Sequence, residues 1–143
     1  MDLLQLTDFI PDMSICTSLY CGVNVLFQRI NEVPRSKGMK DIPDNIIEGI
    51  LLKDEAILRD ASDERVDLVI ENAERFTKDL LLNVSQAGMD LDENLTVFVG
   101  GGSLLLEEYI KAEGIVAKPI FVSNVNANAE GYQFFYESRK AQA

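Results

Sequence analysis

Three consecutive glycines and a serine, Gly100 to Ser103, are the residues whose types and spacing best suit ligand chemistry. They directly follow the apolar run 95–99 and precede a segment of helical composition from Leu104 to Lys111. Glycines let backbone amides approach a ligand closely, and the positive end of a helix dipole favours an anion or a polar ring. The pattern predicts a ligand-binding turn with Ser103 as the helix cap, and a purely structural tight turn is the equal alternative.

The turn does not match the two common phosphate-binding motifs. Leu105 occupies the position of the third glycine in the dinucleotide-binding pattern, and no lysine follows the glycines as in a Walker A loop. The sequence contains no histidine, which excludes Ser-His-Asp and Cys-His catalysis. No carboxylate belongs to a recognisable pair, so we assign no catalytic residue and no metal site to this chain.

Charge and cysteine usage narrow the functional classes further. The chain has 13 Lys and Arg residues against 24 Asp and Glu residues, and its net charge of −11 disfavours nucleic-acid binding. Cys16 and Cys21 fit neither redox nor zinc motifs and are predicted to be buried thiols of a reducing compartment. Asp2 is not typical of a signal peptide, and the longest uncharged run, 13–28, is short and polar for a membrane span. We expect a cytoplasmic, soluble protein without a membrane partner.

The glycine turn needs a scaffold, and the 143 residues are expected to form one domain spanning residues 1–143. A β-hairpin is predicted from Leu3 to Tyr20, with its turn at Ile10-Pro11-Asp12. Apolar spacing predicts a helix from residue 23 to about residue 33, where Pro34 ends the pattern. A short helix is predicted at 46–51.

The second half of the sequence contains the longest predicted helix. It begins after the cap Ser62, carries one apolar stripe and stops at Gly88, and we expect it to cover a sheet along its full length. The run 95–99 shows no alternation, which is typical of a central parallel strand covered on both faces. A second strand is predicted at 119–123 and a final helix from residue 127 or 129 to 140. The order of elements predicts an α/β fold of three layers or close to it.

Three motifs of this chain resemble the actin, sugar-kinase and heat-shock-chaperone ATPase superfamily. Segment 97–105 resembles the adenosine motif, an apolar strand followed by two or three glycines, a small residue and a helix. Segment 125–132 is similar to the second connecting motif, a small-residue helix ending in glycine, and its Asn-Ala-x-Gly-Tyr pattern resembles plasmid-partition actins of the ParM or StbA type. Segment 22–26 is similar to the Gly-x-x-x-Leu that opens the helix after the hairpin.

This resemblance implies the ribonuclease H-like half of the actin-like ATPase fold, a mixed sheet with helices on both faces. It places Gly100, Gly101, Gly102 and Ser103 on the adenosine side of a nucleotide cleft and Gly131 near the hinge. ATP or ADP with Mg²⁺ would be the cofactors of the full-length family, which self-associates into filaments that segregate plasmids or other DNA.

The resemblance also implies what the chain lacks. Asp2 would be the trailing acid of the family's phosphate loop, so the resemblance covers nearly all of this chain but only about half of a family member. The preceding strand, the phosphate loop and the first domain of the family would then be absent. Because positioning of the phosphates supplies most of the acceleration in phosphoryl transfer, we expect no ATP hydrolysis from these residues alone. Without the family's strand before Asp2, the hairpin would have an unpaired edge. We expect this edge to pair with a second copy of the chain, and we predict a weak dimer.

Two alternative functions stay open. The chain could be a fragment of a cell-shape or division actin, or of a small-molecule kinase, from the same superfamily. It could instead be an acidic protein-interaction module without nucleotide, in which the glycine turn is only structural. Stabilisation by a nucleotide would separate the first two functions from the third.

Overall fold

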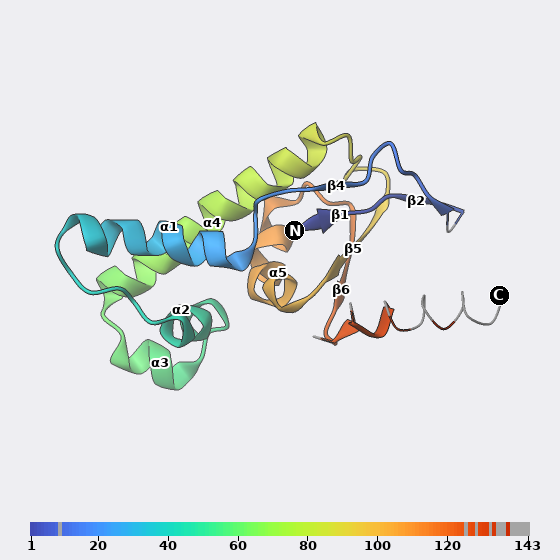
Figure 1. Ribbon diagram of the computed structural model, residues 1–143. Coiled ribbons are helices and arrows are strands. Elements are labelled where there is room, and N and C mark those ends of the chain that lie inside the picture. Colours follow the sequence, from blue (N-terminus) through green and yellow to red (C-terminus); the bar gives the residue numbers. More distant parts are fainter. Residues whose placement is uncertain (9, 125, 128, 132, 134–136, 138–143) are drawn as a thin grey trace.

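The computed structural model describes residues 1–8, 10–124, 126–127, 129–131, 133 and 137. Its elements are, in chain order, β1 (Asp2–Leu3), β2 (Leu6–Thr7), β3 (Ile10–Pro11), β4 (Thr17–Ser18), α1 (Val23–Ser36), α2 (Asp44–Leu51), α3 (Glu55–Asp60), α4 (Asp63–Gln86), β5 (Leu95–Val99), α5 (Gly101–Glu113) and β6 (Lys118–Val122). Helices α1 to α4 occupy one side of the molecule and the strands the other, with α5 beside β5 and β6 (Figure 1). The fold is mixed α/β, which confirms the predicted class at that level.

The longest helix, α4, forms where its apolar spacing predicts. The Ser62 hydroxyl accepts a hydrogen bond from the Arg65 amide at 3.4 Å, and two acids follow in the first turn. However, α4 packs mainly against the helices α1, α2 and α5, so the prediction that it covers a sheet along its full length is wrong. The core lies among these four helices because each turns an apolar stripe toward the others. Its least exposed members include Leu26, Ile30, Ile47, Ile50, Val69, Leu81 and Ile110.

Helix α1 is longer than predicted. It starts at Val23 but continues through Pro34 to Ser36, three residues past the expected end. Pro34 lacks the amide that would bond four residues back, yet it is buried on the core side of α1. Burial therefore outweighs the lost hydrogen bond, and the helix ends just before Gly38, whose φ is +68°.

The short helices α2 and α3 form a pair. Helix α2 begins two residues before the predicted range 46–51 and ends where predicted. Helix α3 was not predicted as a separate element: the Asp54 carboxylate caps it by accepting from the amides of Ala56 and Ile57 at 2.9 and 3.2 Å. A Cβ on Gly49 would clash with the Ile57 side chain, so this glycine lets α3 pack closely on α2.

The predicted hairpin is present, with its reversal at another place. Strand β1 pairs antiparallel with β4, and β2 pairs antiparallel with β3, and the pairing begins one residue before the predicted range Leu3 to Tyr20. The chain reverses between Thr7 and Ile10, where Asp8 has a φ of +52°, and not at residues 10–12. Pro11 lies in β3 instead, because its fixed φ suits the edge of a short strand.

Strands β5 and β6 form a parallel pair with Val97 opposite Ile120. Both strands match the predicted ranges to within one residue, but in the described part of the chain β5 pairs with β6 alone and is not a central strand. The rings of Phe98 and Phe121 stack 5.0 Å apart on the face that packs against the core. On the opposite face Leu95 is 60% exposed, so the run 95–99 is covered on one face only.

The described residues thus form three separate two-stranded sheets. A mixed sheet with helices on both faces, arranged in three layers, is not formed by this part of the chain. The α/β class is shown, and the finer ribonuclease H-like architecture remains a hypothesis.

The two cysteines are free thiols, and both are half-buried, so the prediction that they are buried is only partly correct. The Cys16 thiol donates to the Asp12 carbonyl at 3.1 Å, and the Cys21 sulfur accepts from the Asn83 amide at 3.7 Å. The first contact lies within the hairpin segment, and the second links the segment before α1 to α4.

The predicted final helix falls largely outside the described residues. Of that segment, residues 129–131 are helical and belong to the described part. No helix within the described residues is both long enough and apolar enough to cross a membrane.

Candidate functional site

The glycine turn lies where β5 ends and α5 begins, and its three glycines differ in their surroundings. Gly100 is the N-cap of α5 with a φ of +103°, which residues other than glycine rarely adopt. Gly101 is exposed, and a Cβ placed on it would meet no heavy atom within 4 Å. A Cβ on Gly102 would clash with the Cγ2 atom of Val23. One glycine therefore sets the backbone conformation, one leaves an open surface, and one allows close packing on α1.

Ser103 does not cap α5, so that prediction is wrong. Its hydroxyl donates to the Gly100 carbonyl at 2.6 Å, and its amide donates to the same carbonyl at 3.1 Å. Both bonds hold the turn closed. The amides of Gly101 and Gly102 precede the first intrahelical hydrogen bonds, so they are available to an acceptor on a ligand.

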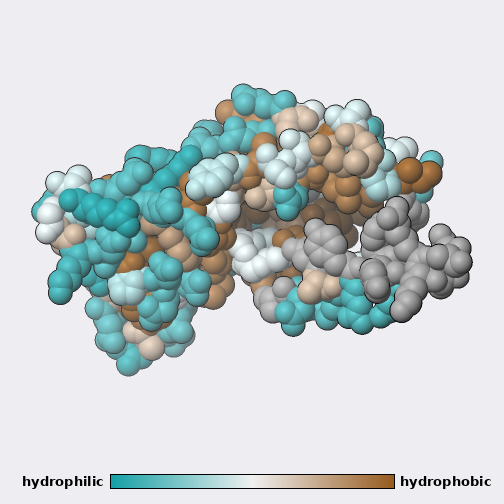
Figure 2. Space-filling view, viewed as in Figure 1, coloured by the Kyte–Doolittle hydropathy of each residue, from teal (hydrophilic) through white to brown (hydrophobic). Residues whose placement is uncertain are grey.

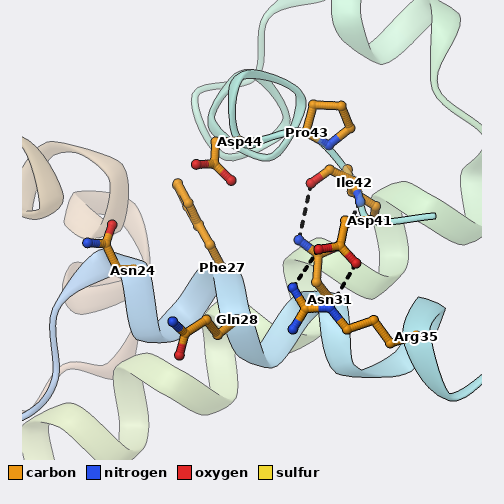
Figure 3. A pocket seen from close by; sticks show the side chains of 9 residues that line it. All are labelled: Asn24, Phe27, Gln28, Asn31, Arg35, Asp41, Ile42, Pro43 and Asp44. Carbon is orange, nitrogen blue, oxygen red and sulfur yellow. Dashed lines mark hydrogen bonds and ion pairs between the residues drawn. The ribbon is translucent and has the colours of Figure 1, made fainter.

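A groove of about 360 Å³ runs along α1 (Figure 3). One wall is a face of α1 that carries exposed polar residues beside the buried Phe27 and Asn31, and the other is the segment that leads into α2. The lining residues are Asn24, Phe27, Gln28, Asn31, Arg35, Asp41, Ile42, Pro43 and Asp44.

Two sets of contacts fix the groove walls. The Asn31 amide donates to the Ile42 carbonyl at 3.1 Å, and its oxygen accepts from the Ile42 amide at 2.7 Å. Asn31 is 4% exposed, so these buried bonds hold the segment before α2 firmly against α1. At the far end the Arg35 guanidinium forms a two-pronged ion pair with Asp41, with Nε donating to Oδ1 at 2.8 Å. The groove is therefore built by the fold and does not depend on a ligand.

The charges in the groove are largely satisfied internally. The hydrogen bond from Arg35 holds the pKa of the Asp41 carboxyl below its ordinary value, and the same bond raises the pKa of Arg35. Asp44 is the remaining charged residue of the lining, at the first position of α2 where the helix dipole stabilises an acid. The groove thus suits a neutral or cationic group with hydrogen-bonding edges better than it suits a phosphate.

The groove and the glycine turn both reach the start of α1, although no residue of the turn lines the groove. Val23, which packs on Gly102, immediately precedes Asn24, the first residue of the groove lining. The turn therefore contacts the end of α1 from which the groove begins. Sequence reasoning missed the groove residues. One indication was available, because Asn31 interrupts the buried stripe of Phe27, Ile30 and Pro34.

The other residues selected from the sequence lie apart from this arrangement. Gly131 is helical and exposed in the described part of the chain, with no heavy atom within 4 Å of a Cβ placed on it. Asp2 lies in β1, where its carboxylate accepts from the Ser18 hydroxyl at 2.5 Å. Among the described residues no three Asp, Glu or Cys side chains converge as metal ligands.

Comparison with known proteins adds no assignment to this geometry. No protein-family model matches the chain, and neither curated proteins nor solved structures gave a match. The features that bear on function are therefore the glycine turn, the groove on α1 and the sequence motifs around them.

Proposed function

We propose that the chain is the adenine-nucleotide-binding, ribonuclease H-like half of a filament-forming actin-like ATPase that segregates plasmids or other DNA in the cytoplasm. The observation that carries this proposal is the open surface over Gly101 at the end of α1 from which the groove begins. The motif resemblance at 97–105 selects the same turn as the adenosine side of a nucleotide cleft. The resemblances at 22–26 and 125–132 support the same superfamily.

The geometry suggests how an adenine nucleotide would lie. The ribose would pass over Gly101, which has no side chain and whose amide precedes the first intrahelical hydrogen bonds of α5. The base would enter the groove, which follows α1 from Asn24 to Arg35, about 16 Å at ~1.5 Å per residue. The phosphates would point away from this chain, because Arg35 is paired with Asp41 and Asp44 is acidic. This arrangement leaves phosphate and Mg²⁺ handling to other parts of the family fold.

Self-association belongs to the same proposal. Leu4, Leu6, Ile10 and Met13 of the hairpin are each more than half exposed. In the described residues β2 and β3 pair only with each other, so their outer edges keep unpaired backbone groups. Apolar side chains beside open strand edges favour pairing with a second copy, and the net charge of −11 weakens that pairing.

Nucleotide binding by a Gly101→Val variant tests the proposal. The backbone of Gly101 lies outside the left-handed region and a Cβ there meets nothing, so the variant should fold. Its side chain would occupy the space of the ribose, so ADP binding should be lost. Isothermal titration with ADP measures the affinity, and circular dichroism checks the fold. Ala112→Val, at an exposed position of the same helix, is the matched control and should bind ADP like the parent chain.

The contrary results are distinct. If millimolar ADP and ATP neither bind the parent chain nor raise its melting temperature, the chain is not a nucleotide-binding half and the interaction-module function is favoured. If Gly101→Val binds ADP as well as the parent chain, the nucleotide does not lie over the glycine turn.

A further inference from the structure

Two carboxamide side chains line the end of the groove at the start of α1. Asn24 and Gln28 lie four residues apart on α1, so they are neighbours on one face of the helix. Both are exposed, and Figure 3 shows no hydrogen bond from either amide to another lining residue. Phe27, 7% exposed, lies on the same helix and its ring points toward Asp44 in Figure 3, so its edge adds a small apolar surface. This end of the groove therefore combines a small apolar surface with two amides that are open to a ligand.

A carboxamide presents a hydrogen-bond donor and an acceptor side by side. This pair complements adenine, whose N6 amino group donates and whose N7 accepts. Guanine presents two acceptors at the corresponding edge, O6 and N7, and is matched by the two parallel donors of an arginine. Arg35 is the one guanidinium of the lining, and Asp41 already accepts from both of its prongs. At the N7 edge of the base, the two carboxamides therefore match adenine and not guanine.

We infer that Asn24 and Gln28 are the specificity-determining residues of this site, whose amides read the base and select adenine over guanine. The inference rests on the proposed function, since it concerns the base of the nucleotide bound there. It assigns a role to two polar residues on the outer face of α1, where packing requires neither of them.

Asp44 on the opposite wall is an alternative residue for recognising the base. Its carboxylate is a pure acceptor, which would suit the N1 and N2 donors on the Watson–Crick edge of guanine. In Figure 3 Asp44 lies across the groove from Asn24 and Gln28. The two carboxamides therefore favour adenine and Asp44 favours guanine. Whether the protein binds ADP or GDP more tightly distinguishes the two alternatives.

The experiment compares ADP with GDP on the full chain and three variants. We expect the parent chain to bind ADP at least about fivefold tighter than GDP, the lower end of what one bidentate amide contact provides. Asn24→Leu and Gln28→Leu should each weaken ADP binding and leave GDP binding unchanged. Gln86→Leu, at the exposed end of α4 outside the groove, is the matched control and should keep the full preference. Titration calorimetry gives the ratios, and side-chain amide signals of Asn24 and Gln28 in NMR spectra should shift with ADP.

Each contrary result has its own meaning. Equal binding of ADP and GDP, or a preference unchanged in both leucine variants, would overturn the inference while the proposed function stands. A preference for GDP that Asp44→Asn removes would assign the reading to Asp44 and also overturn it. If neither nucleotide binds the parent chain, the proposed function fails and the inference fails with it.

Discussion

The helical half and the strand half of this molecule cover their apolar residues to very different extents. Leu26, Ile47 and Leu81 of the helical half are each 0% exposed, because the stripes of α1, α2, α4 and α5 face one another. In the strand half Ile10 is 68% exposed and Leu95 is 60% exposed. Figure 2 shows apolar residues on the surface over the strands, whereas the surface over α1 and α3 is mostly hydrophilic. The difference indicates that the helices form most of the core, while the strands add residues to it from one face and leave apolar side chains exposed on the other.

Truncating one leucine in each half should produce the largest contrast. Leu81→Ala removes a fully buried side chain from α4 and should destabilise the fold by about 2–5 kcal/mol, because it leaves a cavity. Leu95→Ala makes the same chemical change on the open face of β5 and should cost less than about 0.5 kcal/mol. Urea unfolding of both variants measures the two free energies. Similar losses in the two variants would show that the face of β5 is covered in solution.

The glycine turn offers the next largest effect, since it joins the two halves. Gly102→Ala should cost about 1–3 kcal/mol because its Cβ overpacks against Val23 of α1. Gly100→Ala should cost a similar ~1–3 kcal/mol, since alanine at a φ of +103° is strained. Gly101→Ala should be neutral or slightly stabilising, because it meets no atom and alanine favours helix.

Urea midpoints of the three alanine variants would measure this order. The Gly102→Ala, Val23→Ala double variant should recover part of the loss if the two residues compete for one space. Equal costs at all three glycines would show that Gly101 is as structural as its neighbours, which would weaken the case for a ligand at the turn.

The sequence predicted the elements with local, repeated patterns and missed the features formed by distant residues. Helix α4 was predicted to within a few residues because an N-cap at Ser62 and a long apolar stripe act on the same segment. The hairpin reversal was placed wrongly because Pro11 is compatible both with a turn and with an edge strand, and Asp8 gave no comparable indication. Whether β5 is covered on one face or on both also depends on which other elements pack against it. The five residues of the strand do not contain that information.

The candidate site likewise has one part that the sequence predicted and one part that it did not. The glycine turn was predicted from its four adjacent residues, and the structure places it at the junction of β5 and α5. The groove was not predicted, because its walls meet only through bonds between Asn31 and Ile42 and between Arg35 and Asp41. Polar residues on an outer helix face resemble an ordinary solvated surface in the sequence.

Association through the strand half should give a smaller but measurable effect. We expect a weak dimer that is more populated at high salt, because screening reduces the repulsion between two copies of net charge −11. Ile10→Lys should make the chain monomeric, since it places a charge on the exposed hairpin. Leu82→Lys, at an exposed position of α4, is the matched control from the helical half. Sedimentation at low and high ionic strength measures this, and a monomer in both conditions would contradict strand-side association.

The smallest effect concerns the exposed ion pair between Arg35 and Asp41, because surface ion pairs contribute little to stability. The pKa of Asp41 is lowered in the folded protein. The pair therefore stabilises the fold at pH values above 3.8, the ordinary pKa of an aspartate. This contribution is lost as the pH falls through the lowered pKa of Asp41. Asp41→Asn should therefore lower the urea midpoint slightly at pH 7 and match the parent chain in strong acid. A difference that persists in strong acid would mean that Asp41 holds the groove wall by hydrogen bonding, which asparagine does not replace, and not by its charge.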